Sequence, residues 1–204
     1  MGRLYYPFKE NDRELKEIAR GIREKGERIV LTGGTFDVEQ AHPVHVAFLR
    51  ACKELGDVLF VNVTNHNRAV LYKKDKSSVV PRPYYTEHVR ALNVSAIDAV
   101  DHATIHPYVG NPYNPEDVGP TTRLAAIVKP HIIVKGIQED GEGWINREKT
   151  KMKRYLGYDP DFGEIHIEGD ISSTSLFEYG ARTKKGVRNV QLFEGRRHFS
   201  PQMA

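Results

Sequence analysis

Short apolar runs alternate along this chain with segments of helical periodicity, and no other feature limits its fold as strongly. The apolar runs cover residues 29–31, 58–63, 99–103, 132–134 and 165–167. The segments with apolar residues at helical spacing cover residues 43–55, 84–97, 121–128 and 144–156. Alternation of this kind is typical of βαβ units, which build a mostly parallel sheet covered by helices on both faces. We therefore expect an α/β fold with a Rossmann-like, doubly wound parallel sheet in a single domain.

A chain of 204 residues is long enough to bury a core without disulfides or a structural metal. Residues 11–25 have the spacing of a charged amphipathic helix that Gly26 can end, so residues 1–27 are expected to form a helical lead-in. The expected main domain covers residues 28–181. Residues 182–204 form a basic tail with six Lys or Arg against one Glu, which is either solvated or binds phosphate or a partner.

The composition narrows the cellular setting and the range of partners. Cys52 is the single cysteine, so no disulfide framework is possible and a reducing, cytoplasmic compartment is expected. The sequence has neither a long apolar run nor a secretory h-region, so no membrane association is expected. A net charge of +3 is too small to indicate a nucleic-acid-binding surface, so nucleic acid is not an expected partner.

The loop that follows the first apolar run carries residues that point to chemistry. Gly33 and Gly34 allow a ligand to approach the main chain closely, although paired glycines also occur in ordinary turns. Pro43 suits the first turn of a helix, and such a helix would place His42 and His45 on one face of that turn. Because a helix N-terminus attracts anions, this combination favours phosphate chemistry over histidines that only pack.

Sequence motifs follow one another along the chain in a recognisable order. They are GTFD at residues 34–37, HPVH at residues 42–45, Arg82-Pro83 with Arg90 before AVD at residues 99–101, KPHIIVKG at residues 129–136 and ISSTSL at residues 171–176. Together they resemble the signature of the nucleotidyltransferase superfamily, whose pattern contains GTFD, H-x-G-H, K-P-D-x-x-V-K-G and I-S-[ST]-T. Glycerol-3-phosphate cytidylyltransferase and heptose-1-phosphate adenylyltransferase are members. The resemblance covers about residues 20–180.

The resemblance implies an enzyme that transfers AMP or CMP from ATP or CTP to a phosphorylated small molecule, such as a sugar or polyol phosphate, and releases pyrophosphate. It also implies a homodimer and Mg²⁺ as the cation that bridges the phosphates, without metal-ligating side chains in the chain. The implied catalytic residues are His42, His45 and Lys135. The residues implied in nucleotide binding are Thr32, Gly33, Gly34, Thr35, Phe36, Arg90, Gly136, Ser172, Ser173 and Thr174.

Several features depart from the family pattern, and three of them bear on function. Val44 replaces the glycine of H-x-G-H, where a β-branched side chain crowds a nucleotide, and Ser175 stands where a basic residue is frequent. The alternative function is therefore a nucleotide-binding regulatory module that has lost catalysis. Residues 105–120, with four prolines and two glycines, have no counterpart in the pattern and are expected to form a lid, a binding loop or a subunit contact. The choice between ATP and CTP remains open, and the acceptor leans towards a sugar phosphate.

Overall fold

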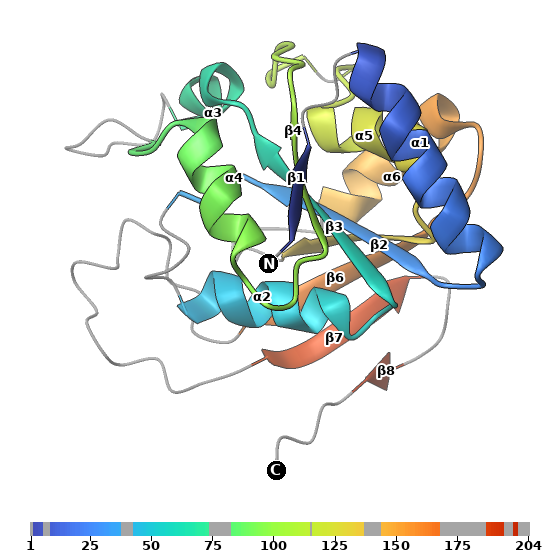
Figure 1. Cartoon of the computed structure of the whole chain (residues 1–204). Helices are drawn as coiled ribbons and strands as arrows, with labels where there is room; N and C mark the ends of the chain where they lie inside the picture. Colours follow the sequence, from blue (N-terminus) through green and yellow to red (C-terminus); the bar gives the residue numbers. More distant parts are fainter. Residues whose placement is uncertain are drawn as a thin grey trace.

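The computed structural model describes residues 2–5, 9–37, 43–73, 83–114, 116–136, 144–167, 187–193 and 198–199, which form an eight-stranded sheet with helices on both faces (Figure 1). The strands are β1 (Arg3–Tyr5), β2 (Ile29–Gly34), β3 (Val58–Thr64), β4 (His102–His106), β5 (Ile132–Gly136), β6 (Asp161–Ile167), β7 (Val187–Phe193) and β8 (His198–Phe199). The helices are α1 (Lys9–Glu24), α2 (Pro43–Lys53), α3 (His66–Lys73), α4 (Glu87–Ser95), α5 (Pro120–Val128) and α6 (Trp144–Leu156).

The strand order is β1-β4-β3-β2-β5-β6-β7-β8, and the pairs from β1 to β6 are all parallel. The chain winds outwards from β2 through β3 to β4, and then continues from β5 on the opposite side of β2 to β6. The direction of winding therefore reverses between β2 and β5. This arrangement confirms the expected Rossmann-like, doubly wound sheet, in which ligands bind at the carboxyl ends of the strands near such a switch point.

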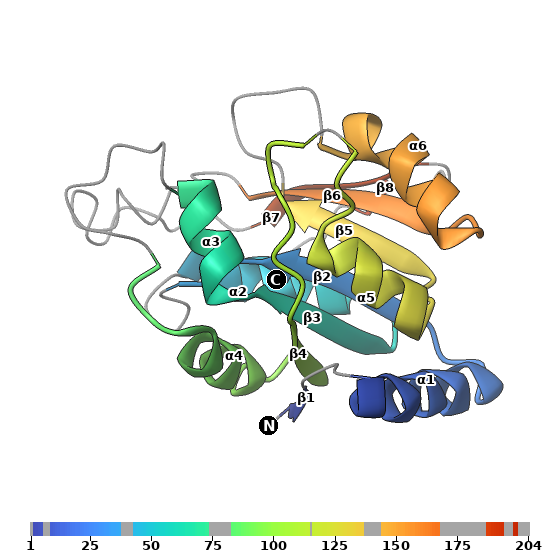
Figure 2. The ribbon, with the colours of Figure 1, turned by 90° about the horizontal axis from the view of Figure 1, so that it is seen from above.

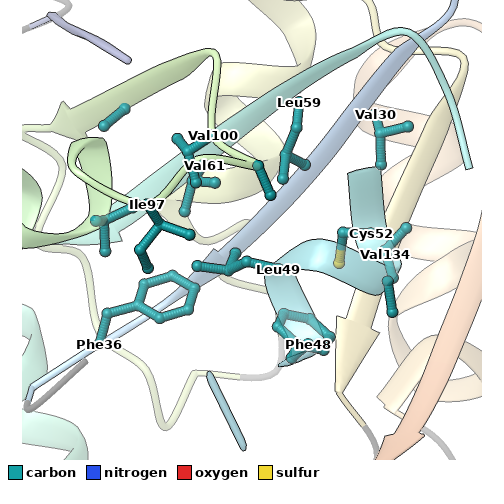
Figure 3. Packing of buried hydrophobic residues seen from close by; sticks show 14 of the residues in the cluster. Val30, Phe36, Phe48, Leu49, Cys52, Leu59, Val61, Ile97, Val100 and Val134 are labelled. Atoms are coloured by element: carbon teal, nitrogen blue, oxygen red, sulfur yellow. The ribbon is translucent and has the colours of Figure 1, made fainter. Parts of the chain in front are cut away.

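The core has two halves because neighbouring residues of each strand face opposite sides of the sheet. Val30 packs with α2 and α4, in a cluster that also contains Phe36 and Cys52 (Figure 3). Ile29 and Leu31 pack on the other side, where α1, α5 and α6 cover the sheet (Figure 2). Within the described ranges, none of the helices combines the length and the apolar character needed to cross a bilayer.

Strand β4, which corresponds to the third apolar run of the sequence, begins later than that run predicts. Residues 99–103 were expected to form it, but β4 starts at His102. Val100 is buried in a turn after α4, and the carboxylate of Asp101 accepts a hydrogen bond from the amide of Leu59 at 2.7 Å. Burial alone therefore produced the apolar pattern before the strand, and Asp101 fixes the point where pairing with β3 begins.

The sheet extends into both segments that were expected to flank the main domain. In the lead-in, Arg3–Tyr5 pairs with β4 and α1 follows within two residues of its expected start. In the basic tail, Val187–Phe193 pairs antiparallel with β6, which differs from a solvated tail. Val187, Val190 and Phe193 favour strands, and the outer edge of β6 offers main-chain groups that need partners.

The described residues of the 105–120 segment are fastened to α3 and α5. The guanidinium of Arg68 donates to the carboxylate of Asp117 at 2.7 Å, and both side chains are buried. The hydroxyl of Tyr108 donates to the other oxygen of the same carboxylate at 2.6 Å, and the Arg123 guanidinium lies 3.6 Å from the centre of the Tyr108 ring. These contacts fix the path of the chain into the N-terminus of α5.

Candidate functional site

The carboxyl ends of β2 and β5 meet at the switch point and bring two of the motifs together. Thr32 lies opposite Val134 in the parallel pair, so GTFD leaves the sheet beside Lys135 and Gly136. The ammonium of Lys135 lies 3.4 Å from the carbonyl oxygen of Gly33 and donates to it. Segments about a hundred residues apart in sequence thus form one edge of the sheet at the place where this fold binds ligands.

The two glycines at the end of β2 make room for protein side chains. A Cβ atom on Gly33 would lie 2.1 Å from Oγ1 of Thr121, in the first turn of α5. A Cβ atom on Gly34 would lie 3.1 Å from the ring of Phe36. The expectation was that both glycines open the main chain to a ligand. In the structure the Cβ side of each glycine is occupied by packing, which brings α5 and Phe36 close to the strand, while the approach of a ligand to the main-chain groups stays a prediction.

Thr32 is fully buried and binds within the protein. Its hydroxyl donates to the carbonyl oxygen of Val134 at 2.9 Å and so ties β2 to β5. Burial raises the pKa of the nearby Cys52 thiol well above its usual range, and a hydrogen bond with Thr32 lowers it in part. Cys52 is therefore a neutral, packed thiol. Thr32 holds β2 and β5 together at the switch point through its hydrogen bond to Val134.

Phe36 and His45 connect the loop after β2 to the start of α2. Phe36 is buried and has a φ of 47°, in the left-handed region that non-glycine residues rarely adopt. Its ring centre lies 5.7 Å from that of His45, and the two planes meet at 77° in an edge-to-face contact. His45 therefore stands in the first turn of α2 beside the loop, as predicted. His42 lies outside the described residues.

Arg90 occupies a different place from the one expected of a phosphate ligand. Its side chain has no exposed surface, and its guanidinium donates to main-chain carbonyls of Thr35, Thr64 and Tyr85. These carbonyls belong to the GTFD loop, the end of β3 and the segment before α4. The buried guanidinium therefore stabilises the main chain around the site through these carbonyls. Its positive charge is not exposed to solvent.

Asp37 is a site residue that the prediction omitted, although it is the last letter of GTFD. Its carboxylate is buried and accepts hydrogen bonds from the amides of Tyr84 at 2.8 Å and Tyr85 at 3.2 Å. The motif could have pointed to it, but nothing in the sequence pairs residue 37 with residues 84 and 85. The acid thus anchors the loop to the approach of α4.

The remaining predicted residues divide between the described and undescribed parts of the chain. Gly136 lies near the ring of Phe48 on α2, at a distance where an added Cβ atom would make ordinary contact, 3.5 Å. Ser172, Ser173 and Thr174 lie outside the described residues. In the part of the chain that is described, no group of three or more His, Cys, Asp or Glu could hold a metal ion.

A cavity of about 500 Å³ lies at the opposite, amino-terminal end of the sheet. Gly21 and Ile22 of α1 line it together with Val58, Asp101 and His102 at the starts of β3 and β4. Burial lowers the pKa of His102 to about 4, so this imidazole is neutral near pH 7. The cavity is separated from the candidate site by the length of the strands.

Comparison with known proteins gives relatives of one kind. The chain is 32% identical over 165 residues to the bifunctional protein HldE of a Nitratiruptor species, an alignment that covers 81% of this chain and 30% of the relative. It is 27% identical over 160 residues to the bifunctional protein HldE of Helicobacter pylori, an alignment that covers 78% of this chain and 31% of the relative. The chain therefore spans about a third of the length of these curated relatives.

Among solved structures, the chain is similar to the lipopolysaccharide core biosynthesis protein from Thermoplasma volcanium. The TM-score is 0.48 and the identity 23%, over 67% of this chain and 94% of that chain. No protein-family model matches the chain. The HldE matches confirm the resemblance to the nucleotidyltransferase superfamily that the ordered motifs indicate.

Proposed function

We propose that the chain, a relative of the nucleotidyltransferase superfamily, transfers a nucleoside monophosphate from ATP or CTP to a phosphorylated small molecule and releases pyrophosphate. The observation that carries this proposal is the convergence at the switch point. The GTFD loop, the first turn of α2 with His45, and Lys135 beside Gly33 all lie at the carboxyl ends of β2 and β5. Helix N-termini in this position bind phosphate.

In the proposed reaction, an oxygen of the acceptor phosphate attacks the α-phosphorus of the triphosphate. The new P–O bond forms as the bond from the α-phosphorus to the oxygen bridging the β-phosphate breaks, and that electron pair leaves with pyrophosphate. The protein contributes positioning and charge stabilisation, which dominate transfers of this type. His45, together with His42, donates hydrogen bonds to the phosphate oxygens, and Lys135 adds positive charge beside Gly33.

Mg²⁺ is part of the proposal as the partner of the triphosphate. Magnesium is commonly held by substrate phosphates and waters with one or two carboxylates, rather than by a cage of protein ligands. When bound, the ion would neutralise charge on the phosphates, while the side chains of this chain orient them.

ATP and a sugar phosphate are the favoured substrates within this proposal. The stretch before GTFD and the KPHIIVKG segment resemble heptose-1-phosphate adenylyltransferases, and the two relatives described above are named HldE. CTP and a polyol phosphate are the second choice. Incubation of the purified chain with each triphosphate, MgCl₂ and a panel of sugar and polyol phosphates should release pyrophosphate with one pair. Absence of pyrophosphate from every pair would refute the proposed activity.

A nucleotide-binding module without turnover is the second candidate, because Val44 and Ser175 replace residues typical of the family. Isothermal titration calorimetry separates the two. Tight binding of ATP or CTP without pyrophosphate release from any acceptor supports the binding module. Restoration of the family residue, Val44→Gly, should then raise turnover if the valine crowds the nucleotide.

A further inference from the structure

Phe36 is held in a strained conformation at the centre of the candidate site. Its φ of 47° costs free energy for a side chain with a Cβ atom, and such strain persists only where the surroundings impose it. The Phe36 ring is held in position because it is buried in the cluster that contains Leu49 and Ile97 (Figure 3). Strained residues of this kind concentrate at functional sites, so the contacts that impose the strain are informative.

Two buried polar groups fix the chain on either side of Phe36. The carbonyl oxygen of Thr35, the residue before it, accepts a hydrogen bond from the guanidinium of Arg90. The carboxylate of Asp37, the residue after it, accepts hydrogen bonds from the main-chain amides of Tyr84 and Tyr85. Arg90 joins these two anchors, because it also donates to the carbonyl of Tyr85 at 3.1 Å.

The ring of Phe36 is placed between the end of β2 and the start of α2. On one side it lies so close to Gly34 that a Cβ atom there would be 3.1 Å away. On the other side its ring meets the imidazole of His45 edge to face, with centres 5.7 Å apart. A different φ at residue 36 would swing the ring out of this position, because the ring follows the Cα–Cβ direction.

We propose that Arg90 and Asp37 are positioning residues that hold Phe36 in its left-handed conformation, and that the Phe36 ring sets the orientation of the His45 imidazole. The proposal rests on the function proposed above, in which His45 contacts phosphate. Arg90 then serves catalysis through the loop and not by touching the nucleotide. Phe36 likewise serves by packing against His45, in place of a direct role in nucleotide binding.

The chain offers a matched control for the loss of a phenylalanine beside a histidine. Phe60 is fully buried on β3 and stacks on His102, with ring centres 4.3 Å apart, on the face of the sheet away from α2. Lys129 has the same φ of 47° as Phe36 but is exposed at the end of α5. Phe60→Leu therefore controls for a lost aromatic contact, and Lys129→Gly controls for released backbone strain.

The test uses nuclear magnetic resonance of the imidazole carbons and protons, with the His45 signals assigned from a His45→Gln spectrum. Phe36→Leu and Arg90→Lys should both move the His45 signals, whereas Phe60→Leu and Lys129→Gly should leave them in place. Because no nucleotide is present, this result does not depend on turnover. Unmoved His45 signals in folded Phe36→Leu and Arg90→Lys proteins would overturn the proposal.

Kinetics provide the second readout and separate positioning from direct binding. If the chain turns over, Arg90→Lys and Phe36→Leu should lower kcat at least tenfold, while KM for the triphosphate changes less than threefold. A rise in KM at unchanged kcat would instead make Arg90 a phosphate ligand and contradict the positioning role. Wild-type protein without any turnover would count against the proposed function alone, since the His45 signals still decide how the ring is held.

Discussion

Oγ1 of Thr121 lies 2.1 Å from the point that a Cβ atom on Gly33 would occupy. The same hydroxyl receives a hydrogen bond from the side-chain amide of Asn62 at 3.2 Å. The end of β2, the middle of β3 and the first turn of α5 are thus fitted to one another at a single point. This contact places the N-terminus of α5 against the end of β2, which flanks the switch point.

Gly33→Ala should therefore lower the free energy of unfolding by about 1–3 kcal/mol, the usual cost of overpacking. Adding Thr121→Ala should recover part of this loss, because it removes the atom that clashes. Gly21→Ala is the control: no atom lies within 4 Å of its added Cβ, and alanine should stabilise α1 by up to about 1 kcal/mol. Urea titrations measure all three. Equal effects of Gly33→Ala with and without Thr121→Ala would contradict the packing described.

Lys129 should be more stable as glycine. Its φ of 47° at the end of α5 lies in the left-handed region, and its side chain is exposed. Lys129→Gly is expected to raise the free energy of unfolding by roughly 1 kcal/mol, because the left-handed conformation costs a residue with a Cβ atom about that much. Thermal unfolding followed by circular dichroism would register the gain as a higher Tm. A lower Tm would mean that the lysine side chain stabilises the helix end.

The buried pair of Arg68 and Asp117 should be necessary for the loop that leads into α5. Asp117→Ala leaves a buried guanidinium without its carboxylate, which typically costs about 3–5 kcal/mol. The exposed pair of Arg13 and Glu17, 3.4 Å apart, is the control, and Glu17→Gln should change stability by less than about 1 kcal/mol. Chemical denaturation of both variants compares them directly. Similar small losses would show that the ion pair does not hold the loop.

Acid should destabilise the protein through His102. Burial lowers its pKa to about 4, whereas the unfolded chain takes up this proton near its ordinary value of 6.5. The contribution to stability is therefore complete above pH 6.5 and is lost as the pH falls towards 4. It amounts to at most about 3 kcal/mol. Replacement by a residue that does not titrate, His102→Leu, should make the fall in unfolding free energy across this pH range shallower, and His106, whose pKa burial also lowers to about 4, contributes to the fall that remains. An unchanged slope would assign the acid sensitivity to other groups.

The sequence was enough to predict at which end of the sheet the candidate site lies, but not the hydrogen bonds made within the site. Apolar runs and helical spacing were enough to bring Gly33 and Lys135 together, because parallel strands put their carboxyl ends at one edge. The roles of Arg90 and Asp37 were not predictable in this way. Both bind main-chain groups that every residue possesses, so no side-chain pattern marks their partners.

Three elements also differ between the prediction and the structure: the start of β4, strand β7 and helix α3. Burial without regular structure explains the first difference, and weak local sequence patterns explain the other two. Val100 is apolar because it is buried in a turn, so the pattern placed the third strand too early. In the tail, the polar residues among the apolar ones of VRNVQLF concealed a strand that pairs with β6. The short helix α3 was not predicted; the side chain of Asn65 accepts from the amide of Arg68 and so caps its first turn.

The most direct test of the proposed activity follows the α-phosphate itself. With ATP labelled at the α-phosphorus, MgCl₂ and a sugar phosphate, the wild-type chain should transfer the label to the acceptor with one pyrophosphate released per label transferred. His45→Ala should reduce that rate on the order of a hundredfold, because it removes a donor from the phosphate oxygens. Labelled CTP and a polyol phosphate complete the set. If a folded wild-type chain moves no label from any triphosphate to any acceptor, or if His45→Ala transfers it at the wild-type rate, the account of this site is contradicted.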